Sequence, residues 1–203
     1  MASSKRARSD ATPRPRLPDA RRRMIEGTID SLRVHGASAT SVDRVLASTG
    51  APRGSVYHHF PGGRTQMITD AVTIAGELMT QFIEQLTREG DSAGALEQFG
   101  ALWRRTLTDS DFRAGCPIFA VAVETNDDTP EFAASAAAIF ERWHLLMTGM
   151  LVREGIAEER AQRLATLTVA SIEGAVALCR VQRSTSPLDD TLSELRILLD
   201  AAR

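Results

Sequence analysis

Apolar residues recur every three or four positions along most of this chain, which is the spacing of one face of an α-helix. This spacing predicts helices over residues 19–34, 40–48, 52–60, 64–88, 92–108, 116–125, 130–154, 158–183 and 189–202. The breaks between them carry glycine, proline or short polar clusters, which interrupt helices. Apolar and polar residues do not alternate over any useful length, as they would in a half-buried strand. We therefore expect an all-α fold.

Charge is divided unevenly along the chain. Residues 1–70 hold 12 Lys or Arg against 6 Asp or Glu, and residues 71–203 hold 12 against 20, so the net charge of −2 separates into +6 and −8. Because DNA is a dense polyanion, the positive segment attracts it and the acidic one repels it. The charge distribution therefore predicts a nucleic-acid contact in the first third of the chain.

The composition also bears on the cell compartment. The longest apolar stretches, such as residues 117–123, fall far short of the roughly 20 residues that span a bilayer, and no apolar stretch of signal-peptide length follows the basic N-terminus. We expect a cytoplasmic protein with no membrane partner. The two cysteines, Cys116 and Cys179, lie far apart in apolar helical segments, which favours reduced core thiols over a disulfide. A redox role for either is the alternative.

Three units are expected along the chain. Residues 1–18 combine five Lys or Arg with three prolines and have no apolar period, which is typical of a disordered basic arm. Residues 19–66 would form a three-helix DNA-binding domain, and residues 67–203 a helical bundle.

The segment from Gly36 to Phe60 has the pattern of a helix-turn-helix. A short amphipathic helix precedes Gly50, which takes a positive φ at low cost and so suits the sharp turn between two steeply crossed helices. Pro52 opens the second helix, where its missing N–H is not needed. Val56 and Phe60 lie four residues apart on the inner face of that helix, so its outer face is polar. That face is the predicted DNA-reading surface.

Several strings in the chain resemble a known family. TSV (residues 40–42) followed by GAPRGSVYHHF (residues 50–60) resembles the signature of the TetR family of transcription regulators. APRGS (51–55), HHFPGG (58–63) and GCPI (115–118) before AVA (120–122) resemble its LmrA/YxaF-like branch. The resemblance is strong over about residues 20–70 and weaker beyond. It implies an N-terminal helix-turn-helix domain, a larger ligand-binding domain with a pocket often used for planar or amphipathic molecules, and a dimer.

The candidate DNA contacts come from the helix-turn-helix and from the start of the following helix. They are Thr40, Ser41, Arg53, Gly54, Ser55, Tyr57, His58 and Arg64. The resemblance implies that the second helix enters the major groove, where Arg53 would form a bidentate contact with guanine N7 and O6. Ser55, Tyr57 and His58 carry donors for phosphates or base edges and are assigned mainly to positioning.

Other members of this set have two interpretations each. Thr40 and Ser41 would bind phosphate or only cap the first helix of the motif. Gly54 would permit close approach to DNA or close packing of helices. Many family members carry a serine cap and a phosphate-binding lysine where this chain has Gly62 and Gly63, so Arg64 or the exposed peptide N–H groups there would replace the lysine.

Catalytic and metal sites are not expected. His58 and His59 are neighbours that point about 100° apart on a helix, and no carboxylate or cysteine completes a ligand set. The chain has no phosphate-binding glycine loop and no recognisable nucleophile with its base and acid. We expect no enzyme activity, no metal and no cofactor. The alternative is a helical small-molecule-binding or enzymatic domain with an N-terminal module that does not bind DNA.

Aromatic residues are concentrated in the larger domain, where eight of the ten follow residue 70. They would line a pocket for a small hydrophobic or planar effector or simply form the core, and polar residues among them could orient a ligand. The candidate ligand-binding residues are Phe99, Trp103, Phe119, Glu124, Phe140, Trp143, Met147 and Glu173.

Two apolar stripes near the C-terminus predict a homodimer. They comprise Leu164, Leu167, Ser171, Ile172, Ala175 and Leu178 in one helix, and Leu192, Leu195, Leu199 and Ala202 in the next. The family resemblance implies that two such helices pair with their two-fold mates in a four-helix interface. A repressor of this kind would hold a pseudo-palindromic operator as a dimer and be released by its ligand.

Overall fold

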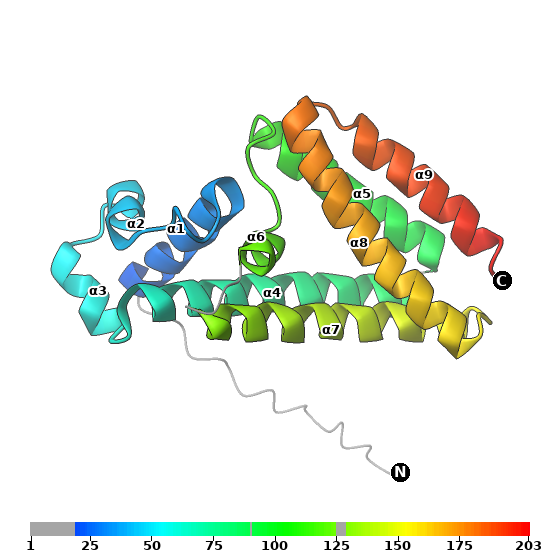
Figure 1. The fold of residues 1–203 in the computed structure, drawn as a ribbon, viewed down its shortest axis with the longest axis horizontal. Coiled ribbons are helices and arrows are strands. Elements are labelled where there is room, and N and C mark those ends of the chain that lie inside the picture. Colours follow the sequence, from blue (N-terminus) through cyan, green and yellow to red (C-terminus); the bar gives the residue numbers. More distant parts are fainter. Residues whose placement is uncertain (1–18, 90, 125–128) are drawn as a thin grey trace, which may run out of the picture.

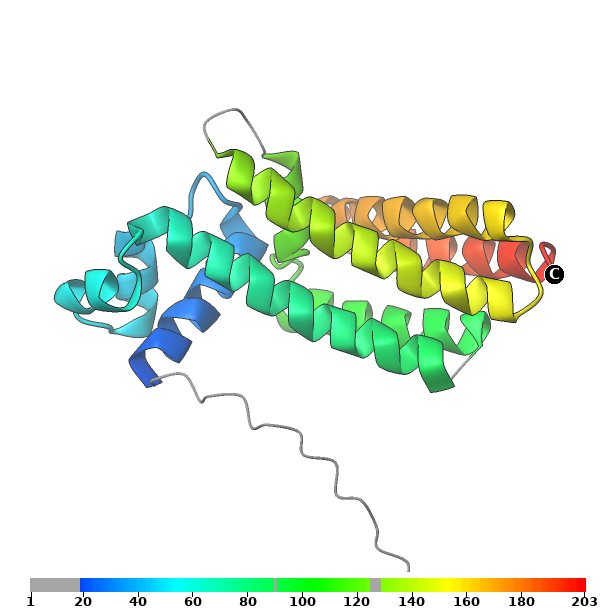
Figure 2. The ribbon, with the colours of Figure 1, turned by 90° about the horizontal axis from the view of Figure 1, so that it is seen from below.

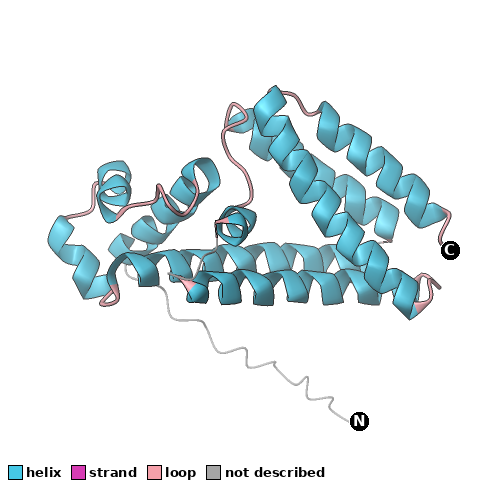
Figure 3. Ribbon diagram, viewed as in Figure 1, coloured by secondary structure: helices cyan, strands magenta, loops and turns pink. Residues whose placement is uncertain are grey.

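The computed structural model describes residues 19–89, 91–124 and 129–203. Over these residues the chain forms nine α-helices and no strand, which confirms the expected all-α fold (Figure 3). The helices are α1 (Asp19–His35), α2 (Val42–Thr49), α3 (Arg53–His59), α4 (Gly63–Glu89), α5 (Ser92–Asp109), α6 (Pro117–Val123), α7 (Pro130–Arg153), α8 (Glu158–Gln182) and α9 (Ser186–Asp200). The predicted basic arm, residues 1–18, lies outside the described residues.

Helices α1, α2 and α3 form a small module around the start of α4 (Figure 1). Met24, Val45, Val56 and Phe60 are buried in its core, so each short helix contributes one apolar face. Gly50 ends α2 with a φ of 65°, and its N–H donates to the Leu46 carbonyl at 2.9 Å. This left-handed cap makes the sharp turn into α3 that the sequence predicted.

The larger domain is a bundle of α5 to α9 built on α4. The long α4 runs from the small module into the larger domain, with α7 beside it in both views (Figures 1 and 2). Helix α8 packs on α7, and α9 packs on α8 and α5. The short α6 contacts α1, α4 and α7. Because α4 belongs to both units, it connects them mechanically, and the predicted domain limit at residues 66 and 67 falls inside it.

The predicted helix limits are close to the observed ones, with one informative exception. Helix α9 begins at Ser186, three residues before the expected start, and includes Pro187 in its first turn. Proline there loses no hydrogen bond, because the first N–H groups of a helix have no partner within it. Proline therefore marks the start of this helix rather than the loop before it.

Helix α8 is the one helix in the described residues whose length and composition would allow it to cross a membrane. Core helices of globular proteins pass the same test. Here α8 is a member of the bundle, and Ala161, Leu164, Ile172 and Cys179 are buried against its neighbours.

Candidate DNA-binding surface and ligand cavity

Helix α3 lies at one end of the molecule (Figure 1), and the residues of its polar face are exposed. Val56 is fully buried beneath it, whereas Arg53, Gly54, Tyr57 and His58 are exposed. The Tyr57 ring is 68% exposed, which is unusual for a large aromatic side chain with no role outside the fold. The predicted orientation of this helix is confirmed.

Arg53 has an exposed partner within the same module. Its guanidinium lies 2.9 Å from the carboxylate of Asp43 on α2, and both side chains are largely exposed. Exposed ion pairs of this kind contribute little stability, so the contact with Asp43 does not hold the Arg53 side chain firmly in place.

Gly54 faces open space. A Cβ atom built on it would have no neighbour within 4 Å. Helix packing therefore does not explain this glycine, and close approach of another molecule is the interpretation that remains.

Thr40 is part of the core and not of the surface. The residue is completely buried, its hydroxyl donates to the Gly36 carbonyl at 2.7 Å, and it shares a second bond of 2.8 Å with the Ser31 hydroxyl. Its peptide N–H donates to Ala37. The predicted phosphate contact of Thr40 is therefore wrong, because neither donor is accessible. Ser41 remains exposed and caps α2 by accepting from the Arg44 N–H at 3.2 Å.

Arg64 joins the start of α4 to the segment before α2. Its Nε donates to the Thr40 carbonyl at 2.7 Å and its Nη2 to the Ala37 carbonyl at 2.5 Å. The predicted replacement of a phosphate-binding lysine does not fit this geometry, since the guanidinium is already turned inward. The N–H of Gly62 is also engaged, by the Gln66 side chain at 2.9 Å.

Three residues of the larger domain form hydrogen bonds with the C-terminal end of α1 and the segment that follows it. The Gly115 N–H donates to the Arg33 carbonyl at 2.8 Å, and the Arg180 guanidinium donates to the Val34 carbonyl at 3.2 Å. The Glu124 carboxylate follows α6 and accepts from the two peptide N–H groups that follow Gly36, of Ala37 at 3.1 Å and Ser38 at 2.6 Å. We call this group of contacts the α1 tether.

Glu124 was expected to bind ligand, and the structure shows otherwise. A Cβ on Gly36, whose φ is 81°, would lie 1.9 Å from a Glu124 oxygen, so only glycine permits this contact. Sequence reasoning missed this contact of Glu124 because its partners are 87 and 86 residues away.

A cavity of about 70 Å³ lies within the larger domain, lined by residues of α4, α5, α7, α8 and α9. Four of the eight candidate ligand-binding residues line it: Phe99, Trp143, Met147 and Glu173. Trp103 instead lines a neighbouring cleft that also contains Cys116 and shares Trp143 with the first cavity. Phe119 and Phe140 are partly buried and pack against the core without lining the cavity, so their predicted role is not supported.

Glu173 is the charged member of the cavity wall among the described residues. It is only 6% exposed, and its Oε2 has no hydrogen-bond partner. Burial raises the pKa of Glu173 to about 7, against the opposing effect of a hydrogen bond from the Cys116 thiol. Burial, followed by the charge of Glu173, raises the pKa of Cys116 well above its usual range, so this thiol is a poor candidate for redox chemistry.

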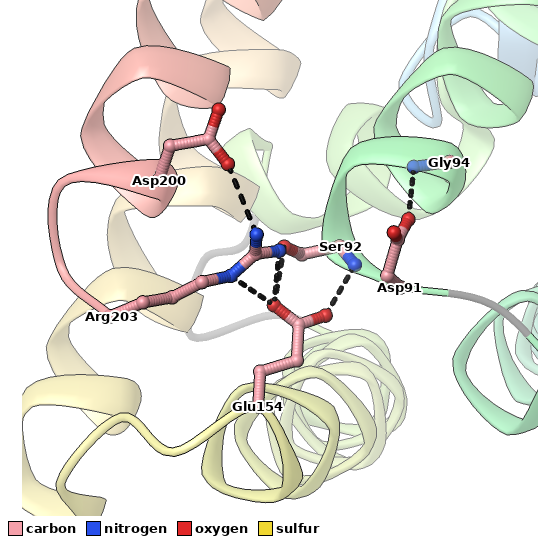
Figure 4. Close-up of polar contacts among 6 residues, drawn as sticks. All are labelled: Asp91, Ser92, Gly94, Glu154, Asp200 and Arg203. Atoms are coloured by element: carbon pink, nitrogen blue, oxygen red, sulfur yellow. Dashed lines mark hydrogen bonds and ion pairs between the residues drawn. The ribbon is translucent and has the colours of Figure 1, made fainter.

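Polar contacts join three helix ends beside Ser92, which is one of the cavity-lining residues (Figure 4). Glu154 at the end of α7 accepts from the Ser92 N–H at 2.5 Å and the Ser92 hydroxyl at 2.8 Å. Arg203 near the end of α9 donates to the same carboxylate at 2.7 Å and to the Ser92 hydroxyl at 3.1 Å. Ser92 lines the cavity, but its polar atoms are therefore already bonded.

Comparison with known proteins decides the family. A family model described as the LmrA/YxaF-like transcriptional regulator C-terminal domain matches residues 92–194. The uncharacterized HTH-type transcriptional regulator Rv0196 of Mycobacterium tuberculosis is 43% identical over 187 residues, which cover 88% of this chain and 93% of that protein. This chain belongs to the LmrA/YxaF-like branch of the TetR family.

Other relatives agree with this assignment. The HTH-type transcriptional regulator YxaF of Bacillus subtilis, itself uncharacterized, is 27% identical over 84% of this chain and 90% of its own length. A TetR transcriptional regulator from Legionella pneumophila has the same fold, with a TM-score of 0.81 at 15% identity over 90% of this chain and 98% of that one. As a TetR-family member, the chain is a DNA-binding transcription regulator and not an enzyme.

TetR-family regulators act as dimers, and α8 of this chain carries an exposed apolar stripe. Leu167, Leu178 and Val181 are 44%, 52% and 84% exposed, and small residues lie between them. A Cβ on Gly174 would meet nothing within 4 Å, so this part of the stripe is open to a close partner.

The other predicted stripe residues pack within the protomer. Leu164, Ile172 and Ala175 of α8 and Leu192, Leu195 and Leu199 of α9 are all buried. The expectation that the α9 stripe faces a partner subunit is wrong, because α9 uses it against α8 and α5. Its exposed apolar residue is Ile197, at 58%.

Proposed function

We propose that this regulator is a cytoplasmic repressor that holds a pseudo-palindromic operator as a homodimer and is released by a small apolar ligand. The outward face of α3 carries the proposal, with Arg53, Gly54, Tyr57 and His58 exposed above the buried Val56. A short helix with donors on its exposed face and no side chain at Gly54 fits the major groove.

Each exposed residue has a role in this proposal. Arg53 reads a guanine, because its fork of donors matches N7 and O6. Ser55, Tyr57 and His58 position α3 on the phosphates, and so does Ser41. The Ser55 hydroxyl donates to the Pro52 carbonyl at 2.6 Å, so donating to a phosphate instead requires rotation of the hydroxyl.

The dimer in this proposal forms through the exposed stripe of α8 and the exposed side of α9 around Ile197. Apolar side chains as exposed as Leu178 and Val181 are explained by burial against a second copy. Two-fold pairing would place the two α3 helices on successive turns of one DNA face, with half-sites about 34 to 36 Å apart.

The ligand acts through α4. Ile83 and Leu86 of this helix line the cavity, and Arg64 at its other end holds the segment before α2. Sites for drug-sized ligands have volumes of about 300 to 1,000 Å³. A cavity of about 70 Å³ must therefore expand to admit one, and α4 would move with its wall.

Operator selection tests the DNA-binding part of this proposal. The purified dimer is offered random duplexes, and affinity for the selected site is measured over a range of salt concentrations. We expect sequence-specific binding that falls steeply with salt, because phosphate contacts release counterions. A protein without sequence preference or without salt dependence would instead have a module for protein contact.

An Arg53→Ala variant tests the role of α3. We expect discrimination at one base pair to fall by about 1 to 3 kcal/mol. The matched control is Arg160→Ala, which makes the same charge change at the start of α8, far from α3 (Figure 1). Equal affinities and specificities for the two variants would show that Arg53 does not read a base.

A further inference from the structure

The Glu173 carboxyl group is a buried acceptor that the fold leaves incomplete. It projects from α8 into the cavity wall, is 6% exposed, and has no partner for Oε2. A buried carboxylate is strongly unfavourable in an apolar setting unless an opposite charge or several donors satisfy it. The thiol of Cys116 is a weak donor and meets only part of that requirement.

The hydroxyl groups of the other polar residues in the cavity wall already have hydrogen-bond partners. The Thr168 hydroxyl donates to the Leu164 carbonyl at 2.8 Å, the Thr87 hydroxyl donates to the Glu84 carbonyl at 3.3 Å, and Ser92 is held by Glu154. Among the described residues that line the cavity there is no Lys, Arg or His. None of the described residues in the cavity wall therefore supplies the missing partner of Glu173.

The surroundings of this carboxyl favour a cation over other ligands. The cavity is walled by Phe99 and Trp143, whose ring faces attract positive charge. Residues 71–203 carry a net charge of −8, which attracts cations and repels anions. Met147 also lines the cavity, and its flexible thioether adapts to ligands of different shape.

We propose that the effector is an apolar aromatic amine whose ammonium group pairs with Glu173 while its rings fill the space between Phe99, Trp143 and Met147. This inference rests on the proposed function, in which the same cavity receives the effector. Pairing satisfies Oε2 and neutralises the buried charge, and the aromatic part of the ligand replaces water at the apolar wall.

Three probes with the same aromatic ring system and different charge test this inference on the full-length protein. They are anthracen-9-ylmethanamine, anthracen-9-ylmethanol and anthracene-9-carboxylate, titrated at pH 8 and followed by anthracene fluorescence. We expect the amine to bind at least about tenfold more tightly than the alcohol, and the carboxylate to bind weakest. Equal affinity of amine and alcohol, or no binding of any probe, overturns the proposal.

A Glu173→Gln variant identifies the residue responsible, because it removes the charge and keeps the size. We expect the preference for the amine to disappear while the affinity for the alcohol stays within about threefold of wild type. Glu194→Gln, an equal charge change at an exposed position of α9, should bind the probes like wild type. Persistence of the amine preference in Glu173→Gln overturns the assignment, and the three-probe comparison on wild type decides the ligand class even if this variant fails to fold.

Operator affinity is measured on the same samples without probe. If the operator is bound but the amine is not preferred, this inference fails and the proposed repressor function stands. If no operator is bound, the repressor function fails whatever the probes do. If both hold, the amine should lower operator affinity in wild type and have little effect in Glu173→Gln.

Discussion

Replacing Glu173 by Gln should change how the stability of this protein depends on pH. Burial raises the pKa of Glu173 from its ordinary value of 4.5 to about 7, so the folded state holds this proton more tightly than the unfolded state. The free energy of unfolding therefore falls as pH rises from about 4.5 through about 7, and is level outside that window. Since one pKa unit corresponds to about 1.4 kcal/mol, the loss attributable to this residue is about 3 kcal/mol.

The measurement is chemical denaturation followed by tryptophan fluorescence, at a series of pH values between 4 and 8. All samples have the same protomer concentration, because the stability of a dimer depends on it. We expect the free energy of unfolding of Glu173→Gln to rise by about 3 kcal/mol relative to that of wild type between pH 4.5 and about 7, because the glutamine does not titrate. Glu194→Gln should follow the wild-type curve. Parallel curves for wild type and Glu173→Gln would refute the claim that the buried carboxyl is destabilised by its surroundings.

Three further predictions concern the DNA surface, the dimer and the α1 tether. Gly54→Ala should leave the fold intact, and raise helix stability by up to about 1 kcal/mol, yet weaken operator binding; unchanged binding would remove the close-approach interpretation. Leu178→Lys should give monomers in analytical ultracentrifugation, whereas Leu145→Lys, at a similarly exposed position of α7, should stay dimeric; dimers in both would place the interface elsewhere. Glu124→Ala should speed amide hydrogen exchange at Ala37 by about tenfold or more, because a hydrogen bond to a charged group contributes about 1.5 to 3 kcal/mol; unchanged exchange would show that the contact is not formed in solution.

The helices and the outward face of α3 could be predicted from the sequence because each depends on local spacing. Val56 and Phe60 are four residues apart, so they define an inner face whatever the rest of the chain does. The roles of Thr40 and Arg64 could not be predicted in the same way. Arg64 bonds to the carbonyl of Thr40, 24 residues away, and only the packing of α4 against α1 brings them together.

The cavity and the dimer surface expose a different limit of sequence reasoning. Helix α8 is apolar on more than one side, and periodicity alone does not tell which side meets its own chain. Leu164 and Leu167 are one turn apart, yet the first is buried in the protomer and the second is exposed. The same ambiguity applied to the aromatic residues. The ring centroids of Phe140 and Trp143 are 5.2 Å apart, yet of these two residues only Trp143 lines the cavity.

Two of the contacts on the segment between α1 and α2, those of Arg64 and Glu124, suggest how a small change at the cavity releases DNA. Arg64 moves with α4, whose other end lines the cavity through Ile83 and Leu86, whereas Glu124 belongs to the end of α6. Both hold the same segment between α1 and α2. If a ligand shifts α4 relative to α6, both contacts cannot keep their geometry, and the module must rotate or lose one of them. The loss of a single charge-assisted bond is about 1.5 to 3 kcal/mol, which matches the coupling of about 1 to 3 kcal/mol typical of allosteric regulators. In the proposed mechanism, one strained contact at this junction is therefore sufficient for induction, without unfolding any helix.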